Sequence, residues 1–267
     1  MSKLTNDQIR QNVRGHYRKI AVKKVEAASS CCAPADSCCD SPAGFDAISA
    51  KLGYSSEDLA AAPEGANLGL GCGNPQAIAE LQAGEHVLDL GSGGGFDCFL
   101  ASRQVGEQGH VIGVDMTPEM ISRARDNAVK GKFNNTEFRL GEIEHLPLAD
   151  NSVHVIISNC VINLSPDKKQ VFREAYRVLQ PGGRLAVSDI ITTAELPPEI
   201  KNDLDELYSG CISGASSIAD VELMLQESGF KEISIEPKDE SRTFIKDWVP
   251  GANVDQYIVS AVIKAKK

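Results

Sequence analysis

The sequence contains no apolar run long enough to cross a membrane. A membrane-spanning helix needs about 18 consecutive apolar residues, and no segment of the 267-residue chain approaches that length. The N-terminus, MSKLTNDQIRQ, also lacks the apolar core of a secretory signal peptide. We therefore expect a cytoplasmic protein without a membrane partner.

Positive charge is in deficit. The chain carries 27 Lys and Arg against 37 Asp and Glu, a formal net charge of -10 at pH 7. Such a chain has no general positive field to attract nucleic acid by counterion release, so we expect no nucleic-acid partner. With 42% hydrophobic and 24% charged residues, the composition is that of a globular protein. No internal repeat is present, and nothing in the sequence requires more than a monomer.

The cysteines lack the spacing of a zinc site. There are eight, but no pair has the CxxC spacing typical of zinc ligands. In a reducing compartment cysteines seldom form structural disulfides, so their function has to be inferred from their surroundings. They form two adjacent pairs close together and four single residues far apart, namely Cys31 with Cys32, Cys38 with Cys39, and Cys72, Cys98, Cys160 and Cys211.

The middle of the chain alternates apolar strands with helices, an order that predicts a parallel sheet. The predicted strands are residues 86–90, 110–114, 136–140, 153–158 and 184–188. A helix is predicted to begin at Phe96, and two more at the N-cap and first-position pairs Thr117-Pro118 and Ser165-Pro166. Pro181-Gly182-Gly183 ends the helix that reaches Leu179.

The segments before this sheet are less regular. Residues 6–21 place apolar side chains one helical turn apart and predict an amphipathic helix that packs as a flank, to which we assign no chemistry. Residues 27–44 are small, polar and Pro-containing and predict a loop. Residues 46–52 read as a short helix and residues 60–75 as a Gly-rich segment.

After Thr193 the pattern changes. A helix is predicted from Pro197-Pro198 through Tyr208, and a second over 217–228. Residues 230–236 and 256–264 read as strands. These strands either extend the edge of the sheet or form a small cap, and the sequence does not decide between the two.

A glycine-rich turn, Asp89-Leu-Gly91-Ser-Gly93-Gly-Gly95, joins the first strand to its helix. Glycines allow a tight turn and a close approach to a ligand, and the helix N-terminus offers free amide hydrogens. Asp115 ends the next strand, 20 residues after Gly95, where an acid accepts hydrogen bonds from ribose hydroxyls. The pattern predicts a cofactor that contains ribose.

The turn is similar to one family of nucleotide-binding loops in particular. The NAD fingerprint G-x-G-x-x-G would need glycine at position 96, where this chain has Phe96. DLGSGGG instead resembles the loop of class I S-adenosylmethionine-dependent methyltransferases, as do Gly141-Glu142-Ile143 and EAYRVLQPGGRLAVSD, residues 174–189. The resemblance spans residues 65–190 and implies an α/β fold with a Rossmann-like sheet.

This resemblance implies a domain organisation and a cofactor site. Residues 1–64 form a helical N-terminal segment with a Cys-rich loop, 65–192 the Rossmann-like core that binds S-adenosylmethionine, and 193–267 a small α+β region that completes the acceptor site. Gly91, Gly93 and Gly95 would flank the methionine moiety, Asp115 would hold the ribose, and Glu142 would lie near the adenine amino group. The other candidates are Asp89, Met116 and Ile143, the last two on either side of the adenine or in the ordinary core, and Asn159 at the methionine end.

Three of the single cysteines stand next to predicted ligand-binding edges. Cys160 follows the fourth strand, Cys72 lies in the Gly-rich segment, and Cys211 follows a helix beyond the fifth strand. We expect these three thiols to meet above the sulfonium, although any one of them taken alone fits a buried core position equally well. Cys98, one turn into the cofactor helix, is assigned to the core. Soft thiolates select soft, thiophilic acceptors.

Four segments are similar to arsenite S-adenosylmethionine methyltransferases: GLGCGNP, DLGSGGGFDCFLASRQVG, SNCVINLSPDK and SGCISGA. The resemblance runs from about Leu68 to the end. It implies that Cys72, Cys160 and Cys211 bind trivalent arsenic, whose lone pair attacks the methyl group, with proximity and orientation as the main contribution of the site. It also implies a role in arsenic detoxification, and reduction by protein thiols that become a disulfide, which thioredoxin or glutathione then reduces. A further N-terminal cysteine of that family corresponds to one of Cys31, Cys32, Cys38 and Cys39.

Two other functions stay open. One is a methyltransferase acting on a small organic acceptor, for which His145, His154 or Asp189 would be the acid or base, although His154 fits an ordinary core histidine better. The other is a thiol-rich protein that binds arsenite without catalysis.

Overall fold

The computed structural model describes residues 4–22, 42–201, 211–249 and 251–267. Most of the predicted loop 27–44 lies outside the described residues, and so do the four cysteines at positions 31, 32, 38 and 39. The later part of the helix predicted from Pro197 to Tyr208 also lies outside them; its described part is α8, Pro198–Lys201. Among the helices that are described, none combines the length and apolar character needed to span a bilayer.

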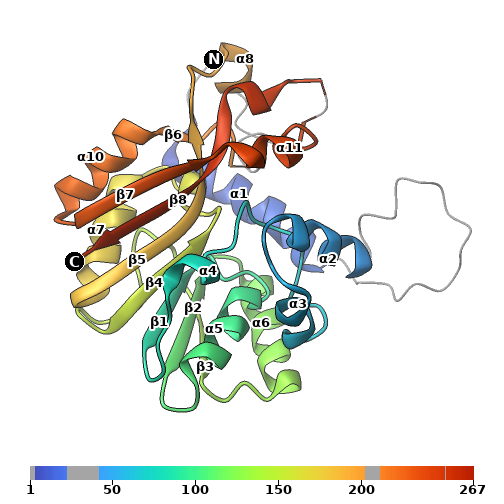
Figure 1. Ribbon diagram of the computed structural model, residues 1–267, viewed down its shortest axis with the longest axis vertical. Helices are drawn as coiled ribbons and strands as arrows, with labels where there is room; N and C mark the ends of the chain where they lie inside the picture. Colours follow the sequence, from blue (N-terminus) through green and yellow to red (C-terminus); the bar gives the residue numbers. More distant parts are fainter. Residues whose placement is uncertain (1–3, 23–41, 202–210, 250) are drawn as a thin grey trace, which may run out of the picture.

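A single sheet runs through the molecule (Figure 1). Five strands lie parallel in the order β3-β2-β1-β4-β5. They are β1 His86–Leu90, β2 His110–Asp115, β3 Thr136–Leu140, β4 Val153–Asn159 and β5 Leu179–Thr192. All five predicted strands are confirmed, although β5 begins earlier and ends later than predicted.

The C-terminal strands extend the same sheet. β8, Ile258–Lys266, pairs antiparallel with β5, and β7, Lys231–Lys238, pairs antiparallel with β8. A two-residue strand, β6 at Ser216–Ser217, also pairs with β5. Of the two arrangements that the sequence left open, the chain therefore adopts the extended sheet edge.

Helices cover both faces of the sheet (Figure 1). α5, Phe96–Val105, and α6, Pro118–Gly131, pack on the face that carries Val87, whereas α7, Lys168–Val178, and α10, Ile218–Ser228, pack on the face that carries Leu88. Neighbouring residues of a strand point to opposite faces, and both faces are buried here. This explains why the strands read as continuous apolar runs rather than as alternating ones.

The predicted helix starts are confirmed in part. Thr117 is the N-cap of α6 with Pro118 at the first helical position, as predicted. The start at Ser165-Pro166 is wrong, because α7 begins at Lys168 after the N-cap Asp167, whose side chain accepts a hydrogen bond from the Gln170 amide. The Ser165 hydroxyl instead donates to the Glu144 carboxylate, 2.7 Å away.

Further helices lie around the ends of the strands. Near the N-terminus are α1 Asn6–Val22, α2 Pro42–Lys51, α3 Ser56–Ala61 and α4 Gln76–Ala79. Short helices elsewhere are η2 Ile162–Leu164, η3 Asp239–Ser241, α11 Arg242–Ile245 and η4 Val254–Gln256. α2 begins before the predicted Asp46, α3 extends into the start of the predicted Gly-rich segment 60–75, and α4 begins directly after that segment.

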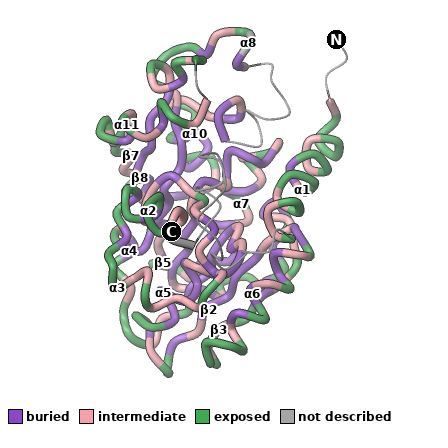
Figure 2. Tube along the Cα trace, turned by 90° about the vertical axis from the view of Figure 1, so that its right-hand side faces the viewer, coloured by how far each residue is buried: buried purple, intermediate pink, exposed green. Residues whose placement is uncertain are grey.

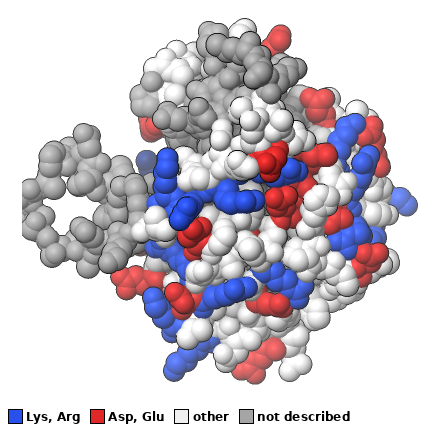
Figure 3. Space-filling view, turned by 180° about the vertical axis from the view of Figure 1, so that it is seen from behind, with Lys and Arg blue, Asp and Glu red and all other residues white. Residues whose placement is uncertain are grey.

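α1 lies beside α6 at the edge of the molecule, with much of its outer side exposed (Figure 2). Arg18 of α1 forms an ion pair with Glu119 of α6 at 2.8 Å, and Arg123 of α6 donates to the Ala21 carbonyl oxygen. On the face shown in Figure 3, basic and acidic side chains are interspersed in the same way. Charge pairing thus supports the apolar contact that the amphipathic pattern of this helix predicts.

Candidate active site

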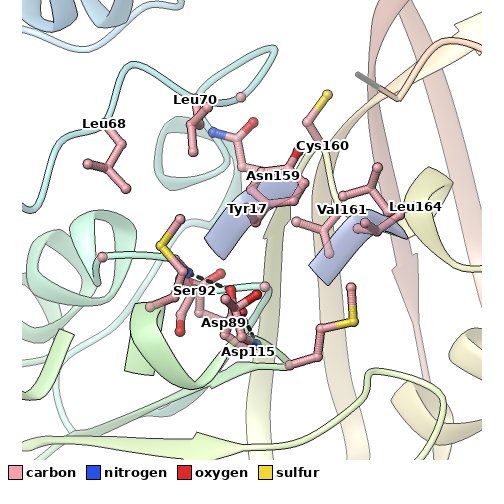
Figure 4. Close-up of a pocket in the computed structure, with 18 of the residues that line it drawn as sticks. Tyr17, Leu68, Leu70, Asp89, Ser92, Asp115, Asn159, Cys160, Val161 and Leu164 are labelled. Atoms are coloured by element: carbon pink, nitrogen blue, oxygen red, sulfur yellow. Dashed lines mark hydrogen bonds between the residues drawn. The ribbon is translucent and has the colours of Figure 1, made fainter. Parts of the chain in front are cut away.

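A cavity of about 330 Å³ opens at the carboxyl ends of the central strands (Figure 4). This is the edge where open α/β sheets bind their ligands. Most of the predicted site residues line it, namely Asp89, Gly91, Gly93, Asp115, Met116, Ile143, Asn159, Cys160 and Cys211. Gly95, Glu142 and Cys72 do not line it.

The glycine loop forms one wall of the cavity. Gly93 adopts a left-handed backbone with a φ of 51°, and a Cβ atom there would meet nothing within 4 Å. The open space above Gly93 therefore lies on the ligand side. Gly95, the N-cap of α5, serves packing instead, because a Cβ atom would lie 2.8 Å from the Phe99 ring.

Asp115 braces this loop. Its carboxylate accepts hydrogen bonds from the backbone amides of Gly93, at 3.0 Å, and Thr117, at 2.8 Å. Burial raises the pKa of Asp115 in spite of these bonds. Nearby, the buried hydroxyl of Ser92 lines the cavity and has no hydrogen-bond partner in the described structure. An open glycine turn, an acid and an unpaired hydroxyl together fit a ligand with ribose hydroxyls.

Asp89 lies beneath the loop and is almost fully buried. Burial, together with the negative charge of Asp97, raises its pKa well above the usual value. The thiol of Cys98 donates a hydrogen bond to Asp89 at 3.2 Å. Cys98 itself is completely buried within the cluster under α5, so its assignment to the core is confirmed.

The predicted adenine-side residues separate into two groups. Ile143 and Met116 line the cavity. The Glu142 carboxylate instead forms ion pairs with two arginines of α1, at 3.2 Å with Arg14 and at 3.5 Å with Arg10. Glu142 thus ties α1 to the loop after β3.

α1 contributes side chains to the cavity that the sequence did not reveal. Val13, His16 and Tyr17 all line it. Burial raises the pKa of Tyr17 well above its usual value. The apolar stripe of this helix was visible in the sequence, but its periodicity does not show what the helix covers.

The predicted thiols come together beside the cavity. The sulfur atoms of Cys72 and Cys160 and a carboxylate oxygen of Asp189 all lie within 4.8 Å of one another. The thiol of Cys211 is outside this group and donates to the backbone carbonyl oxygen of Cys160, 2.7 Å away. All three cysteines are buried free thiols. Three segments far apart in sequence therefore form one thiol cluster.

Two of these cysteines have an uncommon backbone. Cys160 has a φ of 59° and Cys211 a φ of 65°, in the left-handed region that residues with a side chain seldom adopt. Such strain persists only where the surroundings enforce it, and it concentrates at functional sites. The carboxylate of Asp189 accepts hydrogen bonds from the Ile162 amide and the Asn163 side chain, and so holds the turn after Cys160.

A lysine holds the segment that follows Cys211. The Lys168 ammonium group donates to the carbonyl oxygen of Gly214 and to the hydroxyl of Ser216. Burial lowers the pKa of Lys168 and raises that of Asp189 to about 6.

The surroundings of Cys160 and Cys211 favour the protonated form of these two thiols. Hydrogen bonds with Cys211 and Cys72, together with burial, raise the pKa of Cys160 well above its usual value. A hydrogen bond with Cys160 lowers the pKa of Cys211, but burial and the charge of Asp189 outweigh it and raise the pKa overall. A thiophilic ligand must therefore displace protons when it binds.

Asn159 faces the loop that carries Cys72. Its side-chain oxygen accepts a hydrogen bond from the Cys72 amide at 3.0 Å, and its side-chain nitrogen donates to the Gly73 carbonyl oxygen at 2.8 Å. Asn159 was predicted at the methionine end of the cofactor. It does line the cavity, but its amide is engaged with this loop.

The histidines considered for an organic acceptor lie elsewhere. Neither His145 nor His154 lines the cavity. His154, near the start of β4, accepts a hydrogen bond from the His86 amide, at the opposite end of the strand from Cys160. Asp189, by contrast, belongs to the thiol cluster.

Comparison with known proteins identifies the family of the chain. A sequence profile described as a methyltransferase domain matches residues 81–231. An arsenite methyltransferase from Halobacterium salinarum is 51% identical over 98% of this chain, which spans 67% of that protein. The human arsenite methyltransferase is 43% identical over 60% of this chain, which spans 44% of that protein.

A solved structure shares the fold. The crystal structure of an arsenic(III) S-adenosylmethionine methyltransferase from Chlamydomonas reinhardtii superposes with a TM-score of 0.61 at 34% identity, and the match covers 83% of this chain and 73% of that one. The shared fold and the similarity to the Halobacterium protein over 98% of this chain both indicate the same family. The chain belongs to the arsenite methyltransferase family of S-adenosylmethionine-dependent methyltransferases.

Proposed function

We propose that the chain transfers the methyl group of S-adenosylmethionine to trivalent arsenic held by Cys72, Cys160 and Cys211. One observation carries this proposal: buried thiols from three segments cluster beside the cavity that the glycine loop lines. Thiol sulfur is a soft ligand and suits a soft acceptor such as arsenic(III) better than a hard metal ion.

Loading of arsenite is a condensation that balances without an added base. Each thiol forms one S–As bond, and its proton leaves with one hydroxyl of arsenite as water. Three thiols thus release three waters. Burial favours the protonated thiols of Cys160 and Cys211, and the protons that they lose on binding are those that the departing hydroxyls need.

Transfer requires that the arsenic lone pair face the methyl group. S-Adenosylmethionine, bound at the glycine loop, would supply an electrophilic methyl group. Gly93 would flank its methionine moiety and Asp115 would hold its ribose, while the thiol cluster would hold arsenic at the other side of the cavity. The acceptor atom carries no proton, so the site mainly orients the reactants, and α1 screens them from water.

Transfer of a methyl cation converts arsenic(III) into arsenic(V), and two electrons are needed to return it. Two protein thiols supply these electrons when they join as a disulfide, which an external thiol such as thioredoxin or glutathione then reduces. The sulfurs of Cys72 and Cys160, within 4.8 Å of each other, are close enough to pair after a small movement.

The same proposal assigns the regions of the chain. Residues 65–192 would bind the cofactor, with Asp89, Met116 and Ile143 among the contacting groups, and residues 193–267 would complete the arsenic site through Cys211. We propose that the enzyme works as a cytoplasmic monomer in arsenic detoxification.

The test is incubation of the purified protein with labelled S-adenosylmethionine, arsenite and excess thiol, followed by separation of the arsenic species. We expect labelled methylarsenic that depends on both arsenite and the cofactor. Bound arsenite without a methylated product would contradict catalysis. If the protein binds the cofactor but does not bind arsenite, the result would instead support an organic acceptor.

A further inference from the structure

A chain of hydrogen bonds joins the cofactor helix to the Cys72 loop. The hydroxyl of Tyr54, in the turn between α2 and α3, donates to the Asp97 carboxylate in the first turn of α5, at 2.8 Å. The same hydroxyl accepts a hydrogen bond from the side-chain nitrogen of Asn159 at 3.0 Å. Asn159 in turn bonds the Cys72 amide and the Gly73 carbonyl oxygen.

The donors and acceptors along these hydrogen bonds can be assigned in only one way. An ionised carboxylate accepts but does not donate, so Asp97 makes the Tyr54 hydroxyl the donor between them. The oxygen of Tyr54 is then left as an acceptor and faces the NH₂ group of Asn159. The side-chain oxygen of Asn159 consequently faces the Cys72 amide, which needs an acceptor.

An Asn159 side-chain amide rotated by half a turn would lose its hydrogen bonds to both Cys72 and Gly73. If its nitrogen and oxygen exchanged places, two donors would meet at the Cys72 amide and two acceptors at the Gly73 carbonyl oxygen. The loop is packed tightly against this amide, since a Cβ atom on Gly71 would lie 2.7 Å from it. Orientation of the Asn159 side chain therefore decides where the backbone of Cys72 lies.

We propose that Tyr54 is a positioning residue: its hydroxyl, oriented by Asp97, holds the Asn159 amide in the sense that places the Cys72 thiol for arsenic. This inference rests on the proposed function, in which Cys72 is an arsenic ligand. It also gives Asn159 a role on the arsenic side of the site.

Tyr54→Phe isolates the hydroxyl. The ring of Tyr54 is nearly fully buried and packs edge-on against Phe96, with ring centroids 5.0 Å apart, in a small apolar cluster with Leu52 and Leu100. Phenylalanine keeps these contacts. The cofactor loop also keeps its own ties, because Asn127 still donates to the Gly94 carbonyl oxygen and Asp115 still holds Gly93.

Steady-state kinetics with arsenite as the varied substrate test the proposal. One buried hydrogen bond changes an equilibrium by about threefold to tenfold, so we expect the KM for arsenite of Tyr54→Phe to rise by about that factor. The KM for S-adenosylmethionine should stay within about twofold. Tyr176→Phe, which removes a hydroxyl on α7, is the matched control and should behave like the unaltered protein. Equal rises in both KM values, or no rise, would overturn the proposal.

Hydrogen exchange gives a readout that does not depend on arsenic. The Cys72 amide donates to Asn159, and we expect it to exchange at least about threefold faster in Tyr54→Phe than in Tyr176→Phe. Unchanged exchange would overturn the proposal. If the unaltered protein neither binds nor methylates arsenite, the proposed function fails, while this measurement still decides whether Tyr54 holds the Cys72 loop.

Discussion

The thiol of Cys211 donates a hydrogen bond to the backbone carbonyl oxygen of Cys160 across 2.7 Å. The two residues are far apart in sequence, and both have left-handed backbones. A direct bond between two strained residues shows that the segments after β4 and after β5 are fitted to each other. The thiols depend on that fit, so the residues around them are sensitive to small changes.

We predict that the cysteines of the cluster are individually essential. In Cys160→Ser or Cys211→Ser the hydroxyl is a hard ligand with little affinity for arsenic(III), and methylation of arsenite should be abolished. A double substitution of Cys38 and Cys39 should have a milder effect. The assay is the formation of labelled methylarsenic, and full activity in either single variant would show that the proposed acceptor site is wrong.

Gly71 should tolerate no side chain. Alanine there would place its Cβ 2.7 Å from the Asn159 amide on a backbone with a φ of 117°, and so would displace the Cys72 loop. We expect kcat/KM for arsenite to fall by about tenfold or more. Gly182→Ala is the control, because Gly182 has a φ of 81° but open space around it. Equal activities in the two variants would argue against a role for the contact with Asn159.

Asp115→Ala should separate cofactor binding from arsenite binding. The variant loses the carboxylate that braces Gly93 and that would accept the ribose hydrogen bonds. Since bonds to a charged group contribute about 1.5–3 kcal/mol, affinity for S-adenosylhomocysteine should fall by about tenfold to a hundredfold. Titrations of each ligand measure this, and arsenite affinity should stay within about twofold. A parallel loss of both affinities would mean that the variant is misfolded.

The buried Asp189 should make stability depend on pH. Burial raises its pKa from 3.8 to about 6, so the folded state binds the proton more tightly than the unfolded state. Its contribution is then fully present below about pH 4 and is lost as the pH rises through about 6, by up to about 3 kcal/mol. Urea unfolding of the arsenic-free protein at pH 4.5 and 7 should show this loss, and Asp189→Asn should lack it. Parallel pH profiles for the two proteins would contradict the assignment.

The central sheet was predictable because its signals are local. β1 and β3 have the predicted bounds, since apolar runs between turn residues identify buried strands. Cys160 and the glycine loop were placed at one edge because parallel strands end on the same side. That reasoning needs only the order of the elements.

The rest of the fold and of the site depends on contacts between segments far apart in sequence, which no local sequence pattern reveals. The helix start predicted at Ser165-Pro166 was wrong because the Ser165 hydroxyl donates a hydrogen bond to Glu144, in the loop after β3, instead of capping the helix. The contact of Asn159 with Cys72 depends on how the loop before β1 folds back over the end of β4. Tyr17 reaches the cavity only because α1 docks there, and helical periodicity says nothing about the docking site.

The most direct test of arsenic binding by the three thiols is X-ray absorption at the arsenic K-edge on the protein loaded with one equivalent of arsenite. We predict an arsenic atom bound by three sulfurs and no oxygen, and a loss of one sulfur in each of Cys72→Ser, Cys160→Ser and Cys211→Ser. Arsenic that keeps its oxygen ligands in the unaltered protein, or an unchanged sulfur count in any of these variants, would contradict arsenic binding by the three thiols.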